Sequence, residues 1–339
     1  MNPPKAPRSR ILATGHYLPP IVRTNADLEK MVDTTDAWIW ERTGIRERRV
    51  APPEIVTSDM AAAAGRSALD AAGISPRDLD MIIVATVTPD MPMPATAAFV
   101  QQKLGATTCP SFDISAACAG FVYGLTIADQ FIGSGGAERV LVIGVELLSR
   151  IIDWEDRTTC VLFGDGAGAA VIGPAEPAGP DDGKPPRGIL STCLFTDGSL
   201  APSLWLPGGG SLHPASHDVV DKKLHKVAMK GQDIFKAAVR NLYAASKRAM
   251  DLAAMTHADI DWVCAHQANL RILNQVMARL GVDEAKVLAN IERVGNTSSA
   301  SIPILLDENV RQGKIVPGDT VLLCALGAGV SWGSAVVRM

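Results

Sequence analysis

Two stretches of the sequence align without a gap at a distance of 181 residues. Residues 68–85 read ALDAAGISPRDLDMIIVA and residues 249–266 read AMDLAAMTHADIDWVCAH, with five identities. Each has the pattern of a helix end, a short turn, the phrase Asp-Leu/Ile-Asp and an apolar strand. Two later strands recur in the same order: RVLVIGVE matches DTVLLCALG, and LFGDGAGAAVIG matches LGAGVSWGSAVV. Any two helix–turn–strand segments share part of this pattern, but a gapless match of this length favours an internal duplication.

The duplication predicts an α/β protein made of two homologous βα halves, each with a mixed sheet, packed around a pseudo-two-fold axis. We place the halves at residues 1–180 and 181–339. The boundary falls in PAEPAGPDDGKPPRG (174–188), whose five prolines are typical of a surface loop. With 47% apolar and 20% charged residues, a chain of this length can bury a substantial core.

Composition argues against several classes of function. The net charge of −4 disfavours general binding of nucleic acid or anionic membranes. The longest apolar runs are too short to span a bilayer, and the N-terminus has no signal-peptide pattern, so we expect a cytoplasmic protein. Six scattered cysteines without a CxxC pair or a Cys/His cluster predict reduced thiols and no metal site. GDGAG (164–168) runs into a strand rather than a helix, which argues against a phosphate-binding loop.

One cysteine lies among residues with very small side chains. Cys118, in DISAACAGF, follows an expected strand (CPSFDI) and precedes a segment with helical periodicity. The free N–H groups and the dipole of a helix N-terminus stabilise a thiolate, so we expect a lowered pKa for this thiol. A buried cysteine that packs in an alanine-rich helix remains the alternative.

The second half offers two polar residues in matching places. His266 ends the repeated strand in CAHQANLRI, where α/β folds commonly place functional groups. Asn296, in IERVGNTSSASIP, lies close to the position that the duplication pairs with Cys118. A lone histidine is commonly a core residue, and GNTSS alone reads as a turn or helix cap. Together, the three residues predict a site across the pseudo-two-fold axis.

From about residue 10 to residue 339 the sequence resembles the β-ketoacyl-acyl-carrier-protein synthase III family. The resemblance is carried by DISAACAGF, HQANLR and GNTSSAS, with WIWERTGIRERR near the start and LGAGVSWGSA at the end. It implies a thiolase-like duplicated fold with an α-β-α-β-α layer arrangement. It also implies a homodimer and a decarboxylative Claisen condensation of an acyl-CoA starter with malonyl-acyl-carrier protein, which initiates fatty-acid synthesis. No cofactor is implied, since the coenzyme A thioester is a substrate.

The resemblance also assigns roles to residues. Cys118 would form the acyl–enzyme, and His266 and Asn296 would stabilise the enolate by donating to one thioester oxygen. A second oxyanion site would use the backbone N–H groups of Cys118 and Ala328. The family commonly has glycine at 328 and an aromatic at 326. Alanine suffices at a negative φ, whereas Leu326 changes the packing beside the site.

Further assignments concern the substrates. Coenzyme A would be held by six residues: Thr34, Trp38, Arg42, Arg157, Gly231 and Asn269. The acidic carrier protein would meet another six: Lys236, Gln267, Ala268, Asn269, Leu270 and Arg271. Met93 would form the end wall of the acyl pocket across a dimer interface. Without the resemblance, these cations read as ordinary solvated surface charges, and Met93 reads as apolar packing between two prolines.

Other functions stay open at this point. A CoA-dependent condensing or acyl-transferring enzyme of secondary metabolism would share Cys118, His266 and Asn296. A non-catalytic subunit of this fold would lack the nucleophile. A thiolase would need a second catalytic cysteine near the C-terminus, and Cys324 lies within an expected strand instead. The sequence does not identify the starter acyl group.

Overall fold

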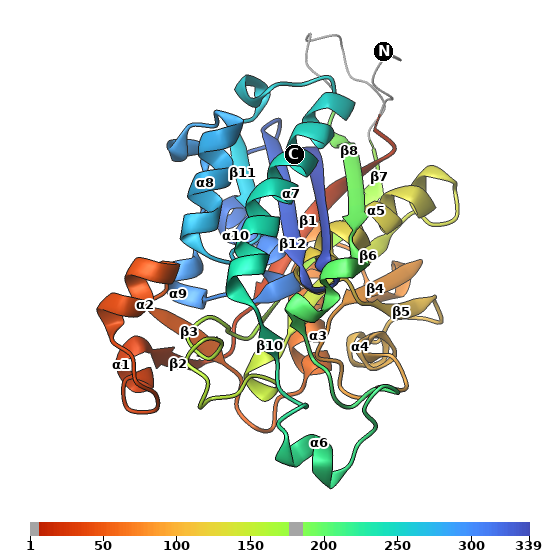
Figure 1. Cartoon of the computed structure of the whole chain (residues 1–339). Coiled ribbons are helices and arrows are strands. Elements are labelled where there is room, and N and C mark those ends of the chain that lie inside the picture. Colours follow the sequence, from red (N-terminus) through yellow and green to blue (C-terminus); the bar gives the residue numbers. More distant parts are fainter. Residues whose placement is uncertain (1–6, 176–185) are drawn as a thin grey trace.

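The computed structural model describes residues 7–175 and 186–339. These residues form two mixed β-sheets separated and flanked by helices, as the sequence predicts (Figure 1). Among them, no helix is long and apolar enough to cross a membrane. In the same part of the chain, no group of three or more His, Cys, Asp or Glu side chains is arranged to hold a metal ion.

The first sheet has the strand order β1-β7-β6-β4-β5. Its strands are β1 (Ser9–Tyr17), β7 (Gly166–Pro174), β6 (Val140–Glu146), β4 (Met81–Ala85) and β5 (Ser111–Ile114). Strand β4 pairs in parallel with β5 and β6, while β7 runs antiparallel to β6 and β1. Every residue of β4 and β6 is buried, because helices cover both faces of the sheet.

The second sheet has the order β11-β12-β13-β8. Its strands are β11 (Trp262–Ala265), β12 (Thr320–Gly327), β13 (Ser331–Arg338) and β8 (Gly188–Thr196). Strands β11 and β12 are parallel, and the other pairs are antiparallel. The repeated segments predicted six of the strands in the two sheets, namely β4, β6, β7, β11, β12 and β13, and the segment before Cys118 predicted β5. All seven are confirmed.

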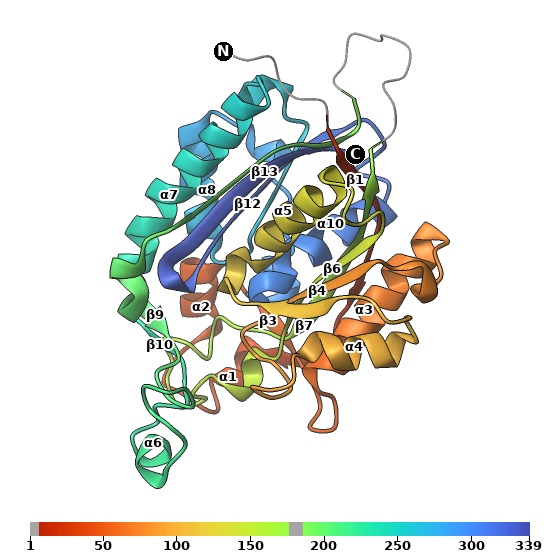
Figure 2. The same ribbon diagram turned by 90° about the vertical axis from the view of Figure 1, so that its right-hand side faces the viewer.

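Helices form three layers around the two sheets (Figure 2). Helices α3 (Thr57–Ala72) and α4 (Thr96–Leu104) pack on the outer face of the first sheet. Helices α7 (Gly231–Leu252) and α8 (Leu270–Leu280) cover the outer face of the second. Between the sheets lie α5 (Gly120–Gly133) and α10 (Ser301–Arg311). The structure thus has the α-β-α-β-α order.

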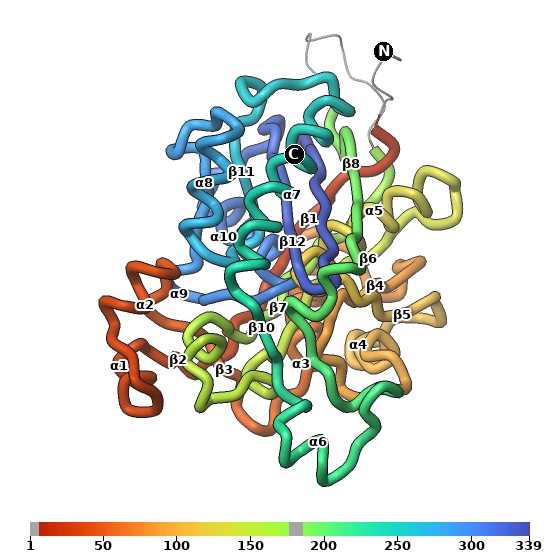
Figure 3. The backbone as a smooth tube through the Cα atoms, in the orientation of Figure 1, coloured from red at the N-terminus to blue at the C-terminus, as the bar shows by residue number. Residues whose placement is uncertain are grey.

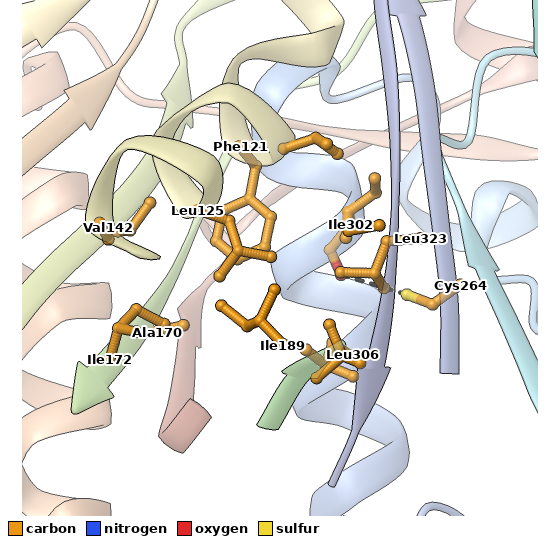
Figure 4. Packing of buried hydrophobic residues seen from close by; sticks show 14 of the residues in the cluster. Phe121, Leu125, Val142, Ala170, Ile172, Ile189, Cys264, Ile302, Leu306 and Leu323 are labelled. Carbon is orange, nitrogen blue, oxygen red and sulfur yellow. Dashed lines mark hydrogen bonds between the residues drawn. The ribbon is translucent and has the colours of Figure 1, made fainter. Parts of the chain in front are cut away.

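The central layer holds one continuous apolar core. Phe121 and Leu125 of α5 are fully buried together with Leu306 of α10 and Leu323 of β12 (Figure 4). Full burial of one such side chain stabilises the fold by ~1.5–3 kcal/mol. Since both sheets pack against this layer, its two helices are held at fixed positions between them. That matters for function because Cys118 lies next to the start of α5.

The 181-residue offset of the sequence repeat continues through the structure. The 3₁₀ turns Pro76–Asp78 (η1) and His257–Asp259 (η5) differ by this offset, as do Ala117–Ala119 (η2) and Ser298–Ala300 (η7). The first residues of α5 and α10 are separated by the same number. The expected boundary between residues 180 and 181 lies outside the described residues, so the division at that point stays a prediction.

Shorter elements surround the layers. Near the N-terminus they are β2 (Ile21–Thr24), α1 (Asn25–Leu28), α2 (Asp36–Thr43) and β3 (Glu47–Val50), and further along the chain η3 (Leu148–Arg150), η4 (Gly198–Ser203), η6 (Glu284–Lys286), α9 (Ile291–Val294) and η8 (Ala328–Val330). An excursion leaves through β9 (Leu204–Trp205), carries α6 (His217–Asp221) and returns through β10 (Ala228–Met229). Figure 3 shows that the α6 part of this excursion projects away from the layers.

Candidate active site

Cys118 lies in the 3₁₀ turn η2, between strand β5 and helix α5, at the strand-to-helix junction that the sequence predicts. The residue is 7% exposed and faces a cavity of about 250 Å³. The cavity wall is mainly apolar, with side chains that include Leu148, Phe163, Leu204, Leu206 and Val227. Such a pocket suits an apolar acyl chain and a thioester more than a charged substrate.

The end of strand β12 lies against the backbone of this cysteine. A Cβ atom at Gly327 would lie 2.4 Å from the backbone nitrogen of Cys118, so only glycine allows the approach. The next residue, Ala328, lines the cavity together with Cys118. Ala328 is not among the non-glycine residues with positive φ in the described chain, so alanine fits here without strain. Leu326 is also buried.

Burial raises the pKa of the Cys118 thiol to about 12. A hydrogen bond with Ser298 acts in the opposite direction, while the charge of Glu146 adds to the increase. Desolvation disfavours the charged thiolate, and here it outweighs the local stabilisation. The expectation of a lowered pKa is therefore wrong for this buried thiol.

His266 follows the last residue of β11 and is 3% exposed. Its backbone N–H donates to the carbonyl of Cys324 in β12, which ends at Gly327 beside Cys118. Its Nδ1 lies 2.6 Å from the hydroxyl of Ser301, at the first position of α10. Burial lowers the pKa of His266 to about 3, so the ring is neutral at ordinary pH.

Asn296 connects the two halves just before turn η7. Its backbone pairs with that of Phe163 in a parallel bridge, and its N–H donates to the carbonyl of Leu162 at 2.9 Å. The side-chain Oδ1 accepts the backbone N–H of Ser298 at 2.9 Å. With its oxygen engaged in this way, the amide is oriented and its NH₂ group is the part left to donate to a substrate.

The structure brings some of the predicted residues to the cavity surface and others into its surroundings. Of the predicted residues, Cys118 and Ala328 line the cavity, and Ser298, which was not predicted, lines it with them. His266 and Asn296 do not line it, although Asn296 bonds to the lining residue Ser298. The three predicted catalytic residues thus come from three places in the chain: η2, the end of β11 and the segment before η7.

Two arginine side chains pack against the ring of Trp38 in helix α2. Arg42 comes from the same helix, and Arg157 comes from the loop after η3. The Arg42 guanidinium is 4.7 Å from the centroid of the Trp38 ring, and that of Arg157 is 5.2 Å from it. Arg157 also donates to the carbonyl of Asp33 at 2.7 Å. Three of the residues predicted to hold coenzyme A therefore form one cluster, in which the two arginines are exposed and Trp38 is half-buried, although Arg157 is distant in sequence.

The other residues predicted to hold coenzyme A differ in their surroundings. Thr34 has a buried hydroxyl oxygen without a hydrogen-bond partner among the described residues. Asn269 caps α8 by accepting the Arg271 N–H, and it donates to the carbonyl of Arg42 at 2.8 Å. Gly231 is exposed at the start of α7. Asn269 thus connects the Trp38 cluster to helix α8.

The residues predicted to meet the carrier protein lie on α7 and at the start of α8. Arg271 and Lys236 are exposed, while Ala268 and Leu270 are half-buried. Gln267 is 0% exposed and accepts the backbone N–H groups at 290 and 291. It cannot contact a docked protein, so its assignment to that surface is wrong. A polar side chain at the end of a strand is equally able to satisfy buried backbone groups.

Met93 lies in the loop between β4 and α4 and is 84% exposed. It does not line the cavity of its own chain. An apolar side chain with this exposure is available for contact with another molecule.

Comparisons with known proteins agree with this geometry. The family model described as 3-oxoacyl-[acyl-carrier-protein (ACP)] synthase III matches residues 112–198, and its C-terminal counterpart matches residues 250–339. The β-ketoacyl-[acyl-carrier-protein] synthase III of Caldanaerobacter subterraneus subsp. tengcongensis is 51% identical over 328 residues, covering 97% of each chain. The chain belongs to the β-ketoacyl-acyl-carrier-protein synthase III family.

Solved structures of synthase III and its relatives share the fold. The 3-oxoacyl-[acyl-carrier-protein] synthase III of Aquifex aeolicus VF5 is 45% identical and has a TM-score of 0.87, covering 98% of this chain and 100% of its own. The priming β-ketosynthase of the R1128 polyketide biosynthetic pathway is 36% identical with a TM-score of 0.88, covering 100% and 98%. The thiolase-like duplicated α/β fold expected from the sequence is confirmed.

Within this synthase III chain, three polar residues near the cavity escaped the sequence analysis. Ser298 and Ser301 stand inside the quoted motif GNTSSAS, where a count of hydroxyls beside Asn296 could have singled them out. Glu146 ends the strand VLVIGVE, and a single charged residue after six apolar ones is a signal of the same kind.

Proposed function

We propose that this protein condenses an acyl-CoA starter with malonyl-acyl-carrier protein to give a β-ketoacyl-acyl-carrier protein, the first condensation of fatty-acid synthesis. The observation that carries the proposal is the position of Cys118. Its thiol faces a small apolar cavity, with the backbone of residues 327 and 328 beside it. Relatives that match nearly the whole chain are named β-ketoacyl-acyl-carrier-protein synthase III, which supports the same reaction.

In the first half-reaction, the Cys118 sulfur attacks the carbonyl carbon of the acyl-CoA thioester. The backbone N–H groups of Cys118 and Ala328 stabilise the oxyanion of the tetrahedral intermediate. The carbon–sulfur bond to coenzyme A then breaks, and the departing thiolate takes up the proton that Cys118 has lost. Sulfur suits the task because one thioester replaces another, so the acyl group stays activated.

In the second half-reaction, malonyl-acyl-carrier protein loses CO₂ and leaves an enolate on the thioester. His266 and Asn296 donate hydrogen bonds to the enolate oxygen where the charge develops. We assign the proton of the neutral His266 ring to Nε2, because the Ser301 hydroxyl can accept the Gln267 N–H and donate its own hydrogen to Nδ1. The enolate carbon attacks the carbonyl carbon of acyl-Cys118, the carbon–sulfur bond to the cysteine breaks, and the thiolate that leaves takes up a proton from solvent.

We assign the two substrates to two separate groups of residues. Trp38, Arg42 and Arg157 offer an aromatic face and two guanidinium groups to the adenine and phosphate groups of coenzyme A. Thr34, two positions before helix α2, is a further candidate contact to the pantetheine arm. Arg271 and Lys236, both exposed, are placed to meet an acidic carrier protein. The protein would act as a cytoplasmic homodimer, and no cofactor takes part.

The test is a two-step assay on the intact protein. Incubation with an isotope-labelled acyl-CoA should give one labelled adduct on Cys118 by mass spectrometry, and malonyl-acyl-carrier protein should then discharge it as labelled β-ketoacyl product. Cys118→Ser should give neither adduct nor product, because an alkoxide at neutral pH is far scarcer than a thiolate. Cys109→Ser is the matched control, since Cys109 is half-buried and bonds only to residues near it. An adduct on another residue, or turnover in Cys118→Ser, would contradict the proposal.

A further inference from the structure

Glu146 is a buried carboxyl group that the mechanism above does not use. It is the last residue of strand β6 and is 0% exposed. Burial of an isolated carboxylate is so unfavourable that such groups are commonly paired with a cation or remain protonated. The side chains that bond to Glu146 are serine and threonine hydroxyls, so no cation among the described residues compensates a charge here.

The two oxygens of this carboxyl group join different halves of the molecule. Oε2 accepts the hydroxyl hydrogen of Thr88 at 2.8 Å and the backbone N–H of Val87 at 3.1 Å, both from the loop after β4. Oε1 lies 3.2 Å from the hydroxyl oxygen of Ser298 and 3.1 Å from that of Ser299, both in turn η7. Glu146 therefore connects the first half to the turn that lies beside Cys118.

A count of hydrogens shows which form of the carboxyl group fits these contacts. The Ser299 hydroxyl has one hydrogen, and it lies 2.8 Å from the carbonyl of Ala85, which can only accept. Ser299 is within donor distance of both Ala85 and Oε1, and we assign its hydrogen to the shorter contact with the Ala85 carbonyl. With that assignment, the 3.1 Å contact between Ser299 and Oε1 takes its hydrogen from Glu146. Oε2 already accepts hydrogens from Thr88 and Val87, and the Thr86 hydroxyl is a third donor at 3.4 Å. The contacts fit a carboxylic acid protonated on Oε1.

Turn η7 connects Glu146 to the reacting groups. The Ser298 hydroxyl contacts Oε1 of Glu146 and also forms the hydrogen bond that favours the Cys118 thiolate. The backbone N–H of the same serine holds the amide oxygen of Asn296. A negative charge on Glu146 would draw the Ser298 hydrogen toward itself and repel a thiolate at Cys118, and both effects act against the nucleophile.

We propose that Glu146 is a positioning residue that works in its uncharged, protonated form: it holds turn η7 against Cys118 and Asn296, and its ionisation hinders formation of the Cys118 thiolate. The proposal rests on the proposed function, in which Cys118 is the nucleophile. It adds a residue from the first half that controls both the thiol and the enolate-binding amide.

Burial raises the pKa of Glu146 to about 7, in agreement with the hydrogen count. Three titratable groups lie on the described elements packed around it. Asp90, in the loop after β4, bonds to the backbone N–H and the hydroxyl of Ser58. Cys118 on η2 feels the charge of Glu146. Asp165 precedes Gly166, the strand partner of Glu146 in β7, but it bonds instead to the N–H groups of Ala51 and Ser149 and to the Ser149 hydroxyl. The hydroxyls of Thr86, Thr88 and η7 that face Glu146 carry no charge.

The ionisation of Glu146 determines how the reactivity of the Cys118 thiol depends on pH. Below about pH 7 Glu146 is protonated, and the reactivity of a thiol with a high pKa should increase tenfold for each pH unit. As the pH rises through 7, the new charge raises the pKa of the thiol further, so the reactivity should increase less steeply. In Glu146→Gln, the amide NH₂ donates to Ser299 and the amide oxygen accepts from Thr88 and Val87, without ionisation.

The experiment measures the rate of Cys118 alkylation by iodoacetamide and of its acylation by acyl-CoA across this pH range. We expect a flattened profile for the wild type and a continuous tenfold increase per pH unit for Glu146→Gln, which should react several-fold faster than the wild type above pH 7. Glu146→Asp, one methylene shorter, cannot span both contacts and should slow malonyl decarboxylation at all pH values. Identical wild-type and Glu146→Gln profiles would overturn the proposal.

A second measurement uses the wild-type protein alone, so it holds even if the variants at Glu146 fail to fold. Infrared spectra of the wild type labelled with ¹³C-glutamate should show a carboxylic-acid C=O band that disappears as the pH rises through 7, and the label separates this band from Asp165. Absence of a glutamic-acid band below pH 7 would refute the protonated form. Failure to form any acyl adduct would refute the proposed function, whereas the alkylation profile and the infrared band would still decide the role of Glu146.

Discussion

Ala117 and Ser298 lie 181 residues apart, and both have left-handed backbone conformations, with φ of 44° and 49°. Each is the first residue of a 3₁₀ turn that leads into a helix of the central layer, and both line the same cavity. Non-glycine residues in this region are strained, and such residues gather at functional sites. The same strained turn therefore occurs in both halves of the duplicated fold, with Cys118 inside the first copy and Asn296 just before the second.

We expect Ala117→Val to destabilise the protein and block acylation. A β-branched side chain is strongly disfavoured at this φ, and the Ala117 Cβ already lies against Gly327. Overpacking costs ~1–3 kcal/mol, to which the added strain contributes. Ala117→Gly is the control, and its free energy of unfolding should be close to that of the wild type. Relief of ~1–2 kcal/mol of left-handed strain offsets the ~0.5–1 kcal/mol that glycine costs. Urea unfolding measures both, and equal stability of the two variants would contradict this reading of the turn.

His266→Ala and Asn296→Ala should impair malonyl decarboxylation far more than acylation of Cys118. Both side chains are assigned to the enolate, and removal of one such donor typically slows the step ~100 to 1,000-fold. The two half-reactions can be followed separately, by mass spectrometry of the acyl adduct and by release of labelled CO₂. Equal losses in both steps would show that these residues also serve the first half-reaction.

Burial of neutral His266 predicts a specific loss of stability in acid. Its pKa is about 3 in the folded protein, against ~6.5 in an unfolded chain. Between these values the unfolded chain binds one more proton, so the free energy of unfolding decreases as the pH falls below ~6.5, by up to ~1.4 kcal/mol per pH unit. Denaturant titrations at several pH values should give a shallower dependence for His266→Gln. His257→Gln, at an exposed site, should keep the wild-type slope.

Arg271→Glu should weaken the use of malonyl-acyl-carrier protein much more than the use of the CoA starter. Charge reversal at this exposed position would repel an acidic partner, and the defect should shrink as salt screens the interaction. Arg77→Glu provides the control, since Arg77 is exposed in η1, on the α3 and α4 side of the molecule. Steady-state kinetics with each substrate varied at low and high salt measure the effect. An equal defect with both substrates at every salt concentration would exclude docking at Arg271.

Met93 should set the length of starter that the enzyme accepts. In a homodimer, this exposed side chain would close the acyl pocket of the partner, and methionine can fold aside where a rigid ring cannot. Each accommodated CH₂ contributes ~0.8 kcal/mol, or about fourfold in preference. A series of acyl-CoA starters should extend beyond acetyl for the wild type and become shorter for Met93→Phe. An unchanged series, or a wild type limited to acetyl-CoA, would reject the role.

The sequence by itself determined the features that depend on local pattern. Apolar runs, helix periodicity and the 181-residue repeat predicted seven strands of the two sheets and the helix after Cys118, though not β1 or β8, because strand and helix formation follows from the spacing of side chains along the chain. The same sequence marked Cys118, His266 and Asn296, since each stands at the end of such an element, where a polar side chain is unusual.

Only the tertiary structure decided the features that depend on which distant residues meet. Gln267 reads as a surface residue beside Asn269, yet packing buries it and uses it to satisfy backbone N–H groups. The thiol of Cys118 has a raised pKa because the two halves together exclude water from it, which no neighbouring residue in the sequence indicates. Glu146 touches turn η7 from 152 residues away, and contacts of that kind depend on how the layers close on one another, not on any local pattern.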